Sequence, residues 1–190
     1  MQIARVALAL LVIVFAAGGC SSAQPQRPVP STDGHRTIAE GYSLLYAITS
    51  QQKDLSKLLL IKSESDAVEV VIDELADYAG QLSGELKDMA NRYPALTVDV
   101  QFLPPVEVKA RESIADETTK LLLANEGKEF ERLLLLKQLS ALEQEHHIAK
   151  VMIGLETADE RRDFWRRTEK RFGELRTAFE RLLESKYFCG

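Results

Sequence analysis

The sequence predicts an all-α protein, a four-helix bundle in which a long crossover carrying a short extra helix joins the second helix to the third. Three observations favour this fold. No alternating apolar segment of strand length occurs between residues 37 and 188. Four long stretches carry apolar side chains at helical spacing. Glycine and proline, which interrupt helices, number only 10 and 6 in 190 residues.

Residues 127–156 are predicted to form the central helix, against which the other helices pack. Four consecutive leucines, at positions 133–136, place apolar groups on every side of this helix. Further along, the pattern narrows to a single stripe, and a helix of this kind needs several neighbours to bury it. The stripe consists of Leu135, Leu139, Leu142, His146, Ala149 and Ile153.

Two predicted helices precede the crossover. The first spans residues 37–61 and the second ends near Arg92, because Pro94 prevents further helix. Between them, residues 63–66 fit a capping box, with Asp66 in place of the preferred Glu. The first apolar stripe is Ile38, Leu45, Ile48, Leu55 and Leu59. The second is Val68, Val71, Ile72, Leu75, Ala79, Leu82, Leu86 and Met89.

Residues 95–105 read as a non-helical connector, and Pro105 suits the first position of a short helix over residues 106–124. Residues 157–160 match a full capping box, from Thr157 to Glu160, and predict the start of the last helix. The stripe of that helix is Trp165, Phe172, Leu175, Phe179 and Leu182.

The breaks between helices define the expected connectivity. Tight breaks after residue 61 and after residue 156 make two antiparallel hairpins, which residues 94–127 must join. The eleven connector residues reach about 36 Å at full extension, so they can run most of the length of the bundle. This is the connectivity of ferritin-like folds rather than of simple up-and-down bundles.

The order of these features resembles the bacterial ferritin-like periplasmic domains of unknown function. The resemblance rests on a serine-rich break after the first helix, Leu103-Pro104 in the connector, Gly-x-x-Phe at residues 127–130, and His146 midway along the third helix. Such domains tend to carry a histidine late in the second helix and another in the fourth. Here those helices carry none, and the second offers instead Asp73, Glu74, Asp77 and Tyr78.

The first 19 residues are typical of a signal peptide, with one charge, Arg5, before an apolar or small-residue run over residues 6–19. Fourteen residues make a helix of about 21 Å, which is too short for a hydrocarbon core of roughly 30 Å. Residues 17–20, Ala-Gly-Gly-Cys, resemble the lipobox of bacterial lipoproteins, which implies cleavage before Cys20 and acylation of that residue. An uncleaved anchor or an ordinary secreted protein is the alternative.

The resemblance to lipoproteins also implies a location. Ser21 and Ser22, rather than Asp, follow the cysteine, which in that family points to the outer membrane, facing the periplasm. Residues 20–36 are rich in serine and proline and lack apolar periodicity, so they predict an extended, solvated tether that includes His35. The folded domain is then expected over residues 37–188.

Without the signal peptide the chain has 171 residues, with 23 basic and 29 acidic side chains and a net charge of −6. This balance argues against a nucleic-acid partner. The length suits one domain with a sizeable core. Acylation of Cys20 leaves Cys189 without an intramolecular partner, so a disulfide framework is excluded, and Cys189 could pair between two chains.

Only one polar pattern suggests chemistry, Glu143-x-x-His146. A ferritin-like di-iron site needs a second such motif on another helix, and none exists, since His147 is adjacent and His35 lies in the tether. A single metal site using His146, Glu143 and a carboxylate of the second helix is one interpretation. The other, which we favour, is an imidazole hydrogen-bonded to a neighbouring helix, with no cofactor.

No catalytic motif stands out: no Gly-rich loop follows a strand, and the carboxylates are scattered on exposed faces. We therefore expect a lipid-anchored, non-catalytic helical bundle that acts by binding or by a structural role, with an envelope protein partner that the sequence does not specify. The alternative is a degenerate ferritin-like metal-binding protein or enzyme that uses His146 and Glu143.

Charge is unevenly distributed along the chain. Residues 64–77 contain six acids and no basic residue, whereas residues 161–171 contain six basic residues and two acids. Arg162, Arg166 and Lys170 form one i,i+4 row, whose mutual repulsion favours anions nearby. In the ferritin-like order this row lies at the end where the tether enters, which predicts a basic collar facing the membrane and an acidic opposite end. Solvation, or pairing with acids of the third helix, is the alternative.

Overall fold

The computed structural model describes residues 33–59, 62, 65–99 and 102–188. Within these ranges the chain is helical and contains no strand, so the predicted all-α class is confirmed. The helices are α1 (Asp33–Gln52), α2 (Leu55–Leu59), α3 (Asp66–Arg92), α4 (Pro105–Ala124), α5 (Gly127–Leu155) and α6 (Asp159–Leu183), followed by the π-helical turn η2 (Glu184–Phe188).

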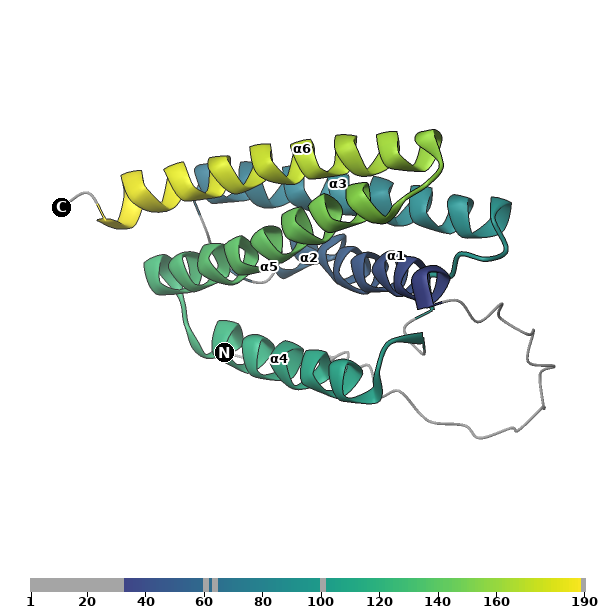
Figure 1. The fold of residues 1–190 in the computed structure, drawn as a ribbon. Helices are drawn as coiled ribbons and strands as arrows, with labels where there is room; N and C mark the ends of the chain where they lie inside the picture. Colours follow the sequence, from purple (N-terminus) through teal and green to yellow (C-terminus); the bar gives the residue numbers. More distant parts are fainter. Residues whose placement is uncertain (1–32, 60–61, 63–64, 100–101, 189–190) are drawn as a thin grey trace, which may run out of the picture.

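Four long helices lie side by side, while α4 lies apart from them along one face (Figure 1). Helix α1 packs against α3 and α5, and α6 packs against α5 and α3. In Figure 1, α1 and α6 run in one direction and α3 and α5 in the other, so the starts of α1 and α6 lie at the same end. Helix α4 spans the length between the end of α3 and the start of α5, and it packs on α5.

The core is built from the apolar stripes that the sequence indicates. In α3 the whole predicted stripe is buried, apart from a half-buried Val71, and in α6 all of it is buried except a half-buried Leu182. At one end of the core Tyr42 of α1 meets Trp165 of α6, with ring centroids 4.9 Å apart in an edge-on arrangement. Edge-to-face aromatic pairs of this kind add specific geometry to the burial of apolar area.

The first predicted helix is interrupted, contrary to expectation. It begins at Asp33, so residues 33–36 belong to α1 and not to the tether, and His35 is exposed on the first turn. It ends at Gln52, and α2 resumes after a two-residue turn. Near this break the hydroxyls of Thr49 and Ser50 donate to carbonyl oxygens of the preceding turn, at 3.1 and 3.2 Å. Such bonds compete with the helical ladder and bend helices.

Helix α3 begins and ends where expected, but its start is capped differently. The N-cap is Ser65, whose side chain makes no capping bond; residues 63 and 64 of the predicted capping box lie outside the described residues. Instead, the Ser65 N–H donates to the carboxylate of Glu131 on α5, at 2.5 Å. The contact with Glu131, distant in the sequence, thus takes the place of the local capping bond. At the other end Tyr93 is extended, as expected for a residue before Pro94.

The capping box expected at residues 157–160 is not formed. Helix α6 starts after Ala158, and no side chain caps it. The side chain of Glu160 instead accepts hydrogen bonds from Tyr93 and Arg92 at the end of α3. The pattern located the start of α6 correctly, but a tertiary contact uses the glutamate.

Helix α4 begins at Pro105, as predicted, and it is the least buried of the long helices. Among its residues only Leu122 is buried, while Val106, Ile114 and Leu123 are exposed. The turn into α5 uses Gly127, whose φ of +55° lies in the left-handed region where a side chain would be strained.

Within the described residues, no helix has both the length and the apolar character needed to cross a bilayer. The predicted signal peptide, Cys20, which is expected to be acylated, and Cys189 lie outside the described residues.

Candidate functional site

The most unusual feature of the domain is a set of buried carboxylates along α5 and at its end. Glu131, Glu145 and Glu156 all have less than a tenth of their surface exposed. Sequence reasoning treated the acids of this helix as exposed. Three residues of the predicted stripe, Leu135, Leu142 and Ala149, are buried as expected. The other three, Leu139, His146 and Ile153, are half-buried, and the residue before each of them is buried instead, which at His146 is Glu145. A signal did exist, because Glu131, Gln138 and Glu145 recur every seven residues on the side that carries Leu134 and Leu142.

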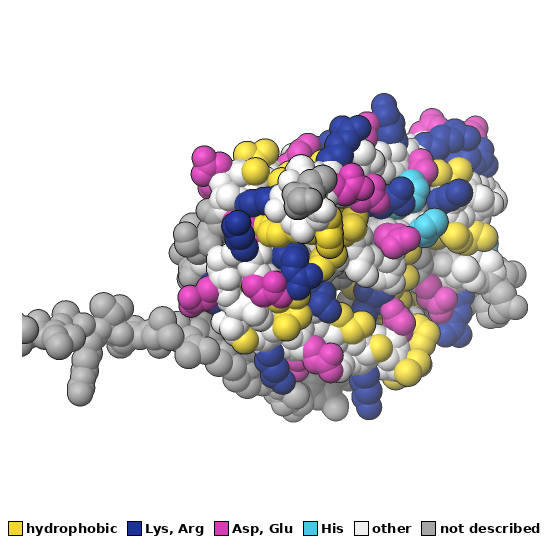
Figure 2. Space-filling view, turned by 90° about the vertical axis from the view of Figure 1, so that its left-hand side faces the viewer, with side chains coloured by type: hydrophobic (Ala, Val, Ile, Leu, Met, Phe, Trp, Pro, Cys, Tyr) yellow, Lys and Arg dark blue, Asp and Glu magenta, His cyan; other side chains and the backbone are white. Residues whose placement is uncertain are grey.

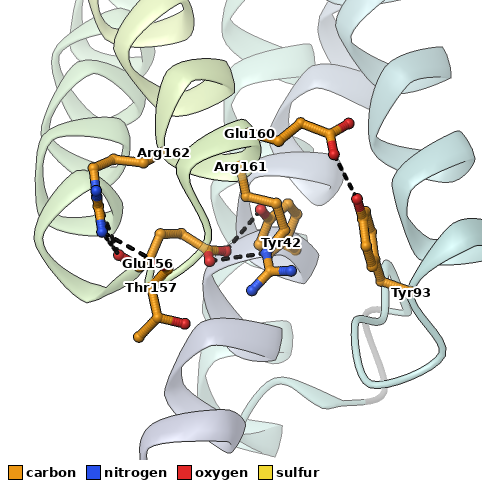
Figure 3. Close-up of polar contacts among 7 residues, drawn as sticks. All are labelled: Tyr42, Tyr93, Glu156, Thr157, Glu160, Arg161 and Arg162. Atoms are coloured by element: carbon orange, nitrogen blue, oxygen red, sulfur yellow. Dashed lines mark hydrogen bonds and ion pairs between the residues drawn. The ribbon is translucent and has the colours of Figure 1, made fainter.

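Glu156 closes the turn between α5 and α6 (Figure 3). Its two carboxylate oxygens accept hydrogen bonds from the hydroxyl of Tyr42 and from Nε of Arg161, each at 2.8 Å. Burial and the adjacent carboxylate raise the pKa of the Tyr42 phenol, which therefore stays a donor. Arg162 donates to the backbone oxygen of Glu156 at 3.0 Å. This acid is fully partnered, which suits a structural role.

Beside this cluster, Tyr93 donates to Glu160 at 2.7 Å (Figure 3), and Arg92 lies 3.1 Å from the same carboxylate. These contacts join the end of α3 to the start of α6. All of these groups are exposed or half-exposed, so the contribution of the ion pair to the free energy of unfolding is small.

Glu131 ties the C-terminal end of the domain to its core. It accepts hydrogen bonds from Lys186, Tyr187 and the backbone N–H of Ser65, and Lys186 also donates to the Ser65 hydroxyl. Burial raises the pKa of Glu131, but these donors outweigh it and bring the pKa down to about 2. Burial, together with the same carboxylate, raises the pKa of the Tyr187 phenol. The cluster joins η2, α5 and the start of α3.

Glu145 is the exception among the three. It is completely buried, and it accepts one hydrogen bond, from Nε2 of Gln52 at 3.1 Å. Its other oxygen, Oε1, has no partner, and neither has Oε1 of Gln52. Burial raises the pKa of Glu145 to about 8, against the opposing effects of Gln52 and of the charge on Arg111 of α4. Strongly perturbed buried acids concentrate at functional sites, although structural networks produce them too.

The residues predicted for a metal site are not brought together. His146 points toward α6, where its Nδ1 lies 3.1 Å from the carbonyl oxygen of Glu169 and its Nε2 lies 3.5 Å from the carboxylate of that residue. Glu143 is exposed, and the acids of α3 do not join them. No cluster of three or more potential ligands from His, Cys, Asp and Glu occurs among the residues that the structure describes. The hydrogen bond between His146 and a neighbouring helix is the arrangement that the favoured interpretation expected.

The predicted basic row is locally paired. Arg162 lies 2.7 Å from Asp159, Arg166 lies 2.7 Å from Asp163, and Lys170 lies 3.8 Å from Glu174. These acids belong to α6 itself, not to α5 as the alternative supposed. The opposite end of the molecule, where α3 starts, mixes Lys and Arg with Asp and Glu (Figure 2). A purely acidic end is therefore not seen on that face.

A groove of about 510 Å³ lies between α4 and the α1–α5 pair. Most of its lining is apolar, contributed by Leu44, Leu103, Pro104, Ile148, Val151 and Leu155, among others. Gly41 of α1 lies in the same wall, where a Cβ would overlap the sulfur of Met152. The glycine thus allows α1 and α5 to approach closely at the base of the groove. On the α4 side Glu107 lines the groove and forms an ion pair with Arg111 one turn later, at 2.8 Å.

Comparison with protein-family models, with curated proteins and with solved structures gave no match for this chain.

Proposed function

We propose that this chain is a lipid-anchored protein of the cell envelope whose helical domain acts by binding rather than by catalysis. The ligand site is the groove between α1, α4 and α5, and its occupant is one acyl chain of a lipid amphiphile. A single observation carries the proposal: the groove is lined mainly by apolar side chains, and its edge exposes Val151 and Leu155, which are 60% and 38% solvent-accessible. Exposed apolar groups gathered around a concavity mark binding sites.

The size and lining of the groove suit an amphiphile. Its volume of about 510 Å³ lies within the roughly 300–1,000 Å³ of ligand sites in general. Burying an alkyl chain there gains about 25 cal/mol per Å² of apolar surface. Polar side chains, including Glu107 and His147, also line the groove, so a ligand with one polar head and an apolar chain matches the lining better than a pure hydrocarbon does.

The position of the groove supports a lipid source. Asp33, where α1 begins one turn before the groove residue Thr37, is 13 residues from Cys20, a distance of at most about 45 Å in an extended chain. If Cys20 is acylated, as the lipobox pattern predicts, the groove stays within that reach of a bilayer. Two or more acyl chains on one cysteine anchor a protein stably, whereas one does so only marginally.

The proposal extends to the arrangement of the helices, for which we favour a four-helix bundle in the ferritin-like order. Arg92 and Glu160 join the end of α3 to the start of α6, and Arg171 and Glu74 join these helices again nearer the start of α3, at 2.7 Å. These contacts suit antiparallel neighbours. No contact between Asp73 and Arg166, which an up-and-down order would favour, is found among the described residues.

The anchor is tested with Cys20→Ser in the full chain. We expect the variant to be lost from washed membranes, because without the thiol no acyl chain is attached. Retention of the variant in the membrane fraction would contradict the lipid anchor and would leave the groove unaffected as a proposal.

The groove is tested with a photoreactive fatty acid added to cells that make the full chain, followed by peptide mapping of the labelled sites. We expect labels on the peptides of α1 and α5 that line the groove. Val151→Glu should abolish them, because it places a charge in an apolar site. Val70→Glu is the matched control, since Val70 is equally exposed, at 64%, but lies on α3 away from the groove. Equal labelling of the two variants would contradict the proposal.

A further inference from the structure

The groove lies at the end of the domain where residues 20–32 join it. The starts of α1 and α4 and the end of α5 lie together at that end (Figure 1). The α1 wall of the groove runs from Thr37 to Leu44, and Thr37 lies one turn after Asp33, the first residue of α1. The α5 wall runs from Gln144 to Leu155, about 16 Å along the helix. The chain that precedes Asp33 is therefore attached beside the groove.

The charged side chains that line the groove are two acids, Glu40 and Glu107, without a Lys or Arg. Glu40 is paired with Arg36, at 2.8 Å. Glu107 is paired with Arg111, also at 2.8 Å. An anionic lipid head in the groove would meet carboxylates whose cations are already engaged, and like charges repel. The lining therefore favours an acyl chain whose polar linkage is uncharged.

Three buried donors of the described residues lack a hydrogen bond, but they do not offer an anionic head a binding group in the groove. Nε of Arg111 forms the ion pair with Glu107. Nε of Arg176 lies 3.3 Å from the carboxylate of Glu180. The third donor is Nε1 of Trp165, whose side chain is completely buried in the core. None of these three donor residues lines the groove.

Residues 20–32 can bring an uncharged linkage to the groove. An acyl group on Cys20, which the lipobox pattern predicts, is joined by an ester or amide bond and has no charge. Arg27 is the only charged residue of this stretch, and its charge is opposite to that of the two acids in the lining. The 13 residues from Cys20 to Asp33 span about 20 Å as a flexible coil and about 40 Å if their prolines keep them extended. Either length lets the acyl chain reach the groove.

Attachment also favours this chain over the lipids of the bilayer. A short linker gives the attached group an effective concentration in the millimolar range at a site that the linker can span. A bilayer lipid has no such link, and it loses translational and rotational freedom when it binds. The chain on Cys20 has lost most of that freedom already.

We propose that one acyl chain of Cys20 occupies the groove of the same protein molecule, so that the protein binds its own lipid. This inference rests on the proposed function, because it names the source of the chain that the groove binds. The other chains on Cys20 stay in the bilayer. The end of the domain formed by the starts of α1 and α4 is then held against the membrane.

Cross-linking in the full chain identifies the source of the occupant. Cells that make the protein are fed a fatty acid with a photoreactive group at its methyl end, and the washed membranes are irradiated, digested and analysed by mass spectrometry. We expect peptides of α1 or α5 joined through the acyl chain to the Cys20 peptide, in protein that migrates as a monomer. Val151→Glu should abolish these peptide pairs, because it places a charge at the apolar site. Val70→Glu, an equally exposed position away from the groove, should keep them.

Each of the other results overturns the inference in a different way. Groove peptides labelled only by lipid that is not attached to Cys20 would identify a bilayer lipid as the occupant and leave the proposed function standing. Peptide pairs found only in cross-linked dimers would place the chain in the groove of a second copy. An acylated Cys20 without any labelled groove peptide would refute the proposed function as well. A Cys20 peptide without an acyl chain would refute the lipid anchor.

The length of the tether provides a quantitative test. An insertion of about 26 Gly and Ser residues after Ser31 triples the 13 residues between Cys20 and Asp33, and the effective concentration falls as the −3/2 power of length, about fivefold. The ratio of Cys20-linked to bilayer-lipid adducts on the groove peptides should fall by the same factor. The same insertion after Gly190 is the control, and it should leave the ratio unchanged. An unchanged ratio in the lengthened tether would overturn the inference.

Discussion

Two acids on one helix, Glu131 and Glu145, show that burial alone does not fix the charge of a carboxylate. Both are buried, fourteen residues apart on α5. Burial raises the pKa in both cases, yet Glu131 ends at about 2 because three donors bind it, and Glu145 ends at about 8 because one does. The donors of Glu131 include the ammonium group of Lys186, 2.6 Å away, whereas the donor of Glu145 is the uncharged amide of Gln52. The number and the charge of the donors together decide the outcome. One acid therefore serves as a fixed structural charge and the other as a titrating group.

The largest effect is expected from Glu131→Ala. Removing this acid leaves Lys186 half-buried without its counter-ion and the Ser65 N–H without an acceptor, so we expect a loss of about 3–5 kcal/mol in the free energy of unfolding. Denaturation followed by fluorescence of the single, buried Trp165 measures it. Glu129→Ala is the control on the same turn: its ion pair with Arg132 is exposed, and a much smaller loss is expected. Equal losses would contradict the contrast between the two acids.

The pH dependence of this contribution has a defined sign. The folded-state pKa of Glu131 is lowered from 4.5 to about 2, so its stabilisation is fully present above about pH 4.5 and is lost as the pH falls toward 2. Acid unfolding of the wild type should accordingly be steeper in this window than that of Glu131→Ala.

The contribution of Glu145 to stability should depend on pH in the opposite direction, which Glu145→Gln tests. The folded-state pKa of Glu145 is raised from 4.5 to about 8, so folding is favoured most below about pH 4.5, and this group reduces stability by about 1.4 kcal/mol per pH unit up to about pH 8. The glutamine removes that slope and keeps an oxygen that accepts the hydrogen bond from Gln52. We therefore expect the variant to gain up to about 3 kcal/mol at neutral pH, measured by denaturation between about pH 5 and pH 8. A variant with the wild-type slope would show that Glu145 is not the titrating group.

A smaller effect is expected at His146, which neighbours Glu145 but faces α6. His146→Asp places a second carboxylate opposite that of Glu169, now 3.5 Å from the ring, and should cost about 1–3 kcal/mol. His146→Leu, which keeps the volume, and His146→Gln, which keeps a donor for the Glu169 carbonyl, should cost less. Equal thermal stability of the three variants would mean that the contact with α6 contributes little.

The sequence predicted what depends on periodicity and on local chain geometry. The helices, the stripes of α3 and α6, the stop before Pro94 and the start at Pro105 all follow from side chains acting within one or two turns. What it missed depends on partners distant in the chain. The capping box at Thr157 failed because Glu160 binds Tyr93, and Glu131 and Glu145 were overlooked because Lys186 and Gln52, their partners, are 55 and 93 residues away.

The interruption of α1 shows the same limit at short range. Leu55 and Leu59 continue the stripe of the first helix, so periodicity alone predicts one helix over residues 37–61. The hydroxyls of Thr49 and Ser50 donate hydrogen bonds to carbonyl oxygens of the preceding turn. Whether a threonine or serine forms such a bond within a helix depends on the other contacts of its side chain. The Thr49 hydroxyl also accepts a hydrogen bond from the hydroxyl of Ser83 on α3, at 3.0 Å. No local sequence pattern predicts this contact.

The smallest effect on the free energy of unfolding is expected in the basic row of α6, where Arg162 and Arg166 differ in their number of partners. Arg162 binds Asp159 and also the backbone oxygen of Glu156 at the end of α5, so Arg162→Ala should cost about 1 kcal/mol. Arg166 binds only Asp163, an exposed pair, and Arg166→Ala should cost less than about 0.5 kcal/mol. Equal costs in denaturation experiments would show that the backbone contact adds nothing.

If the row faces the membrane, as the sequence predicted, then Arg166→Glu in the Cys20→Ser chain should weaken binding to anionic vesicles several-fold, while binding to neutral vesicles and the unfolding midpoint stay unchanged. Unchanged binding to anionic vesicles would leave the row as a set of solvated pairs within α6.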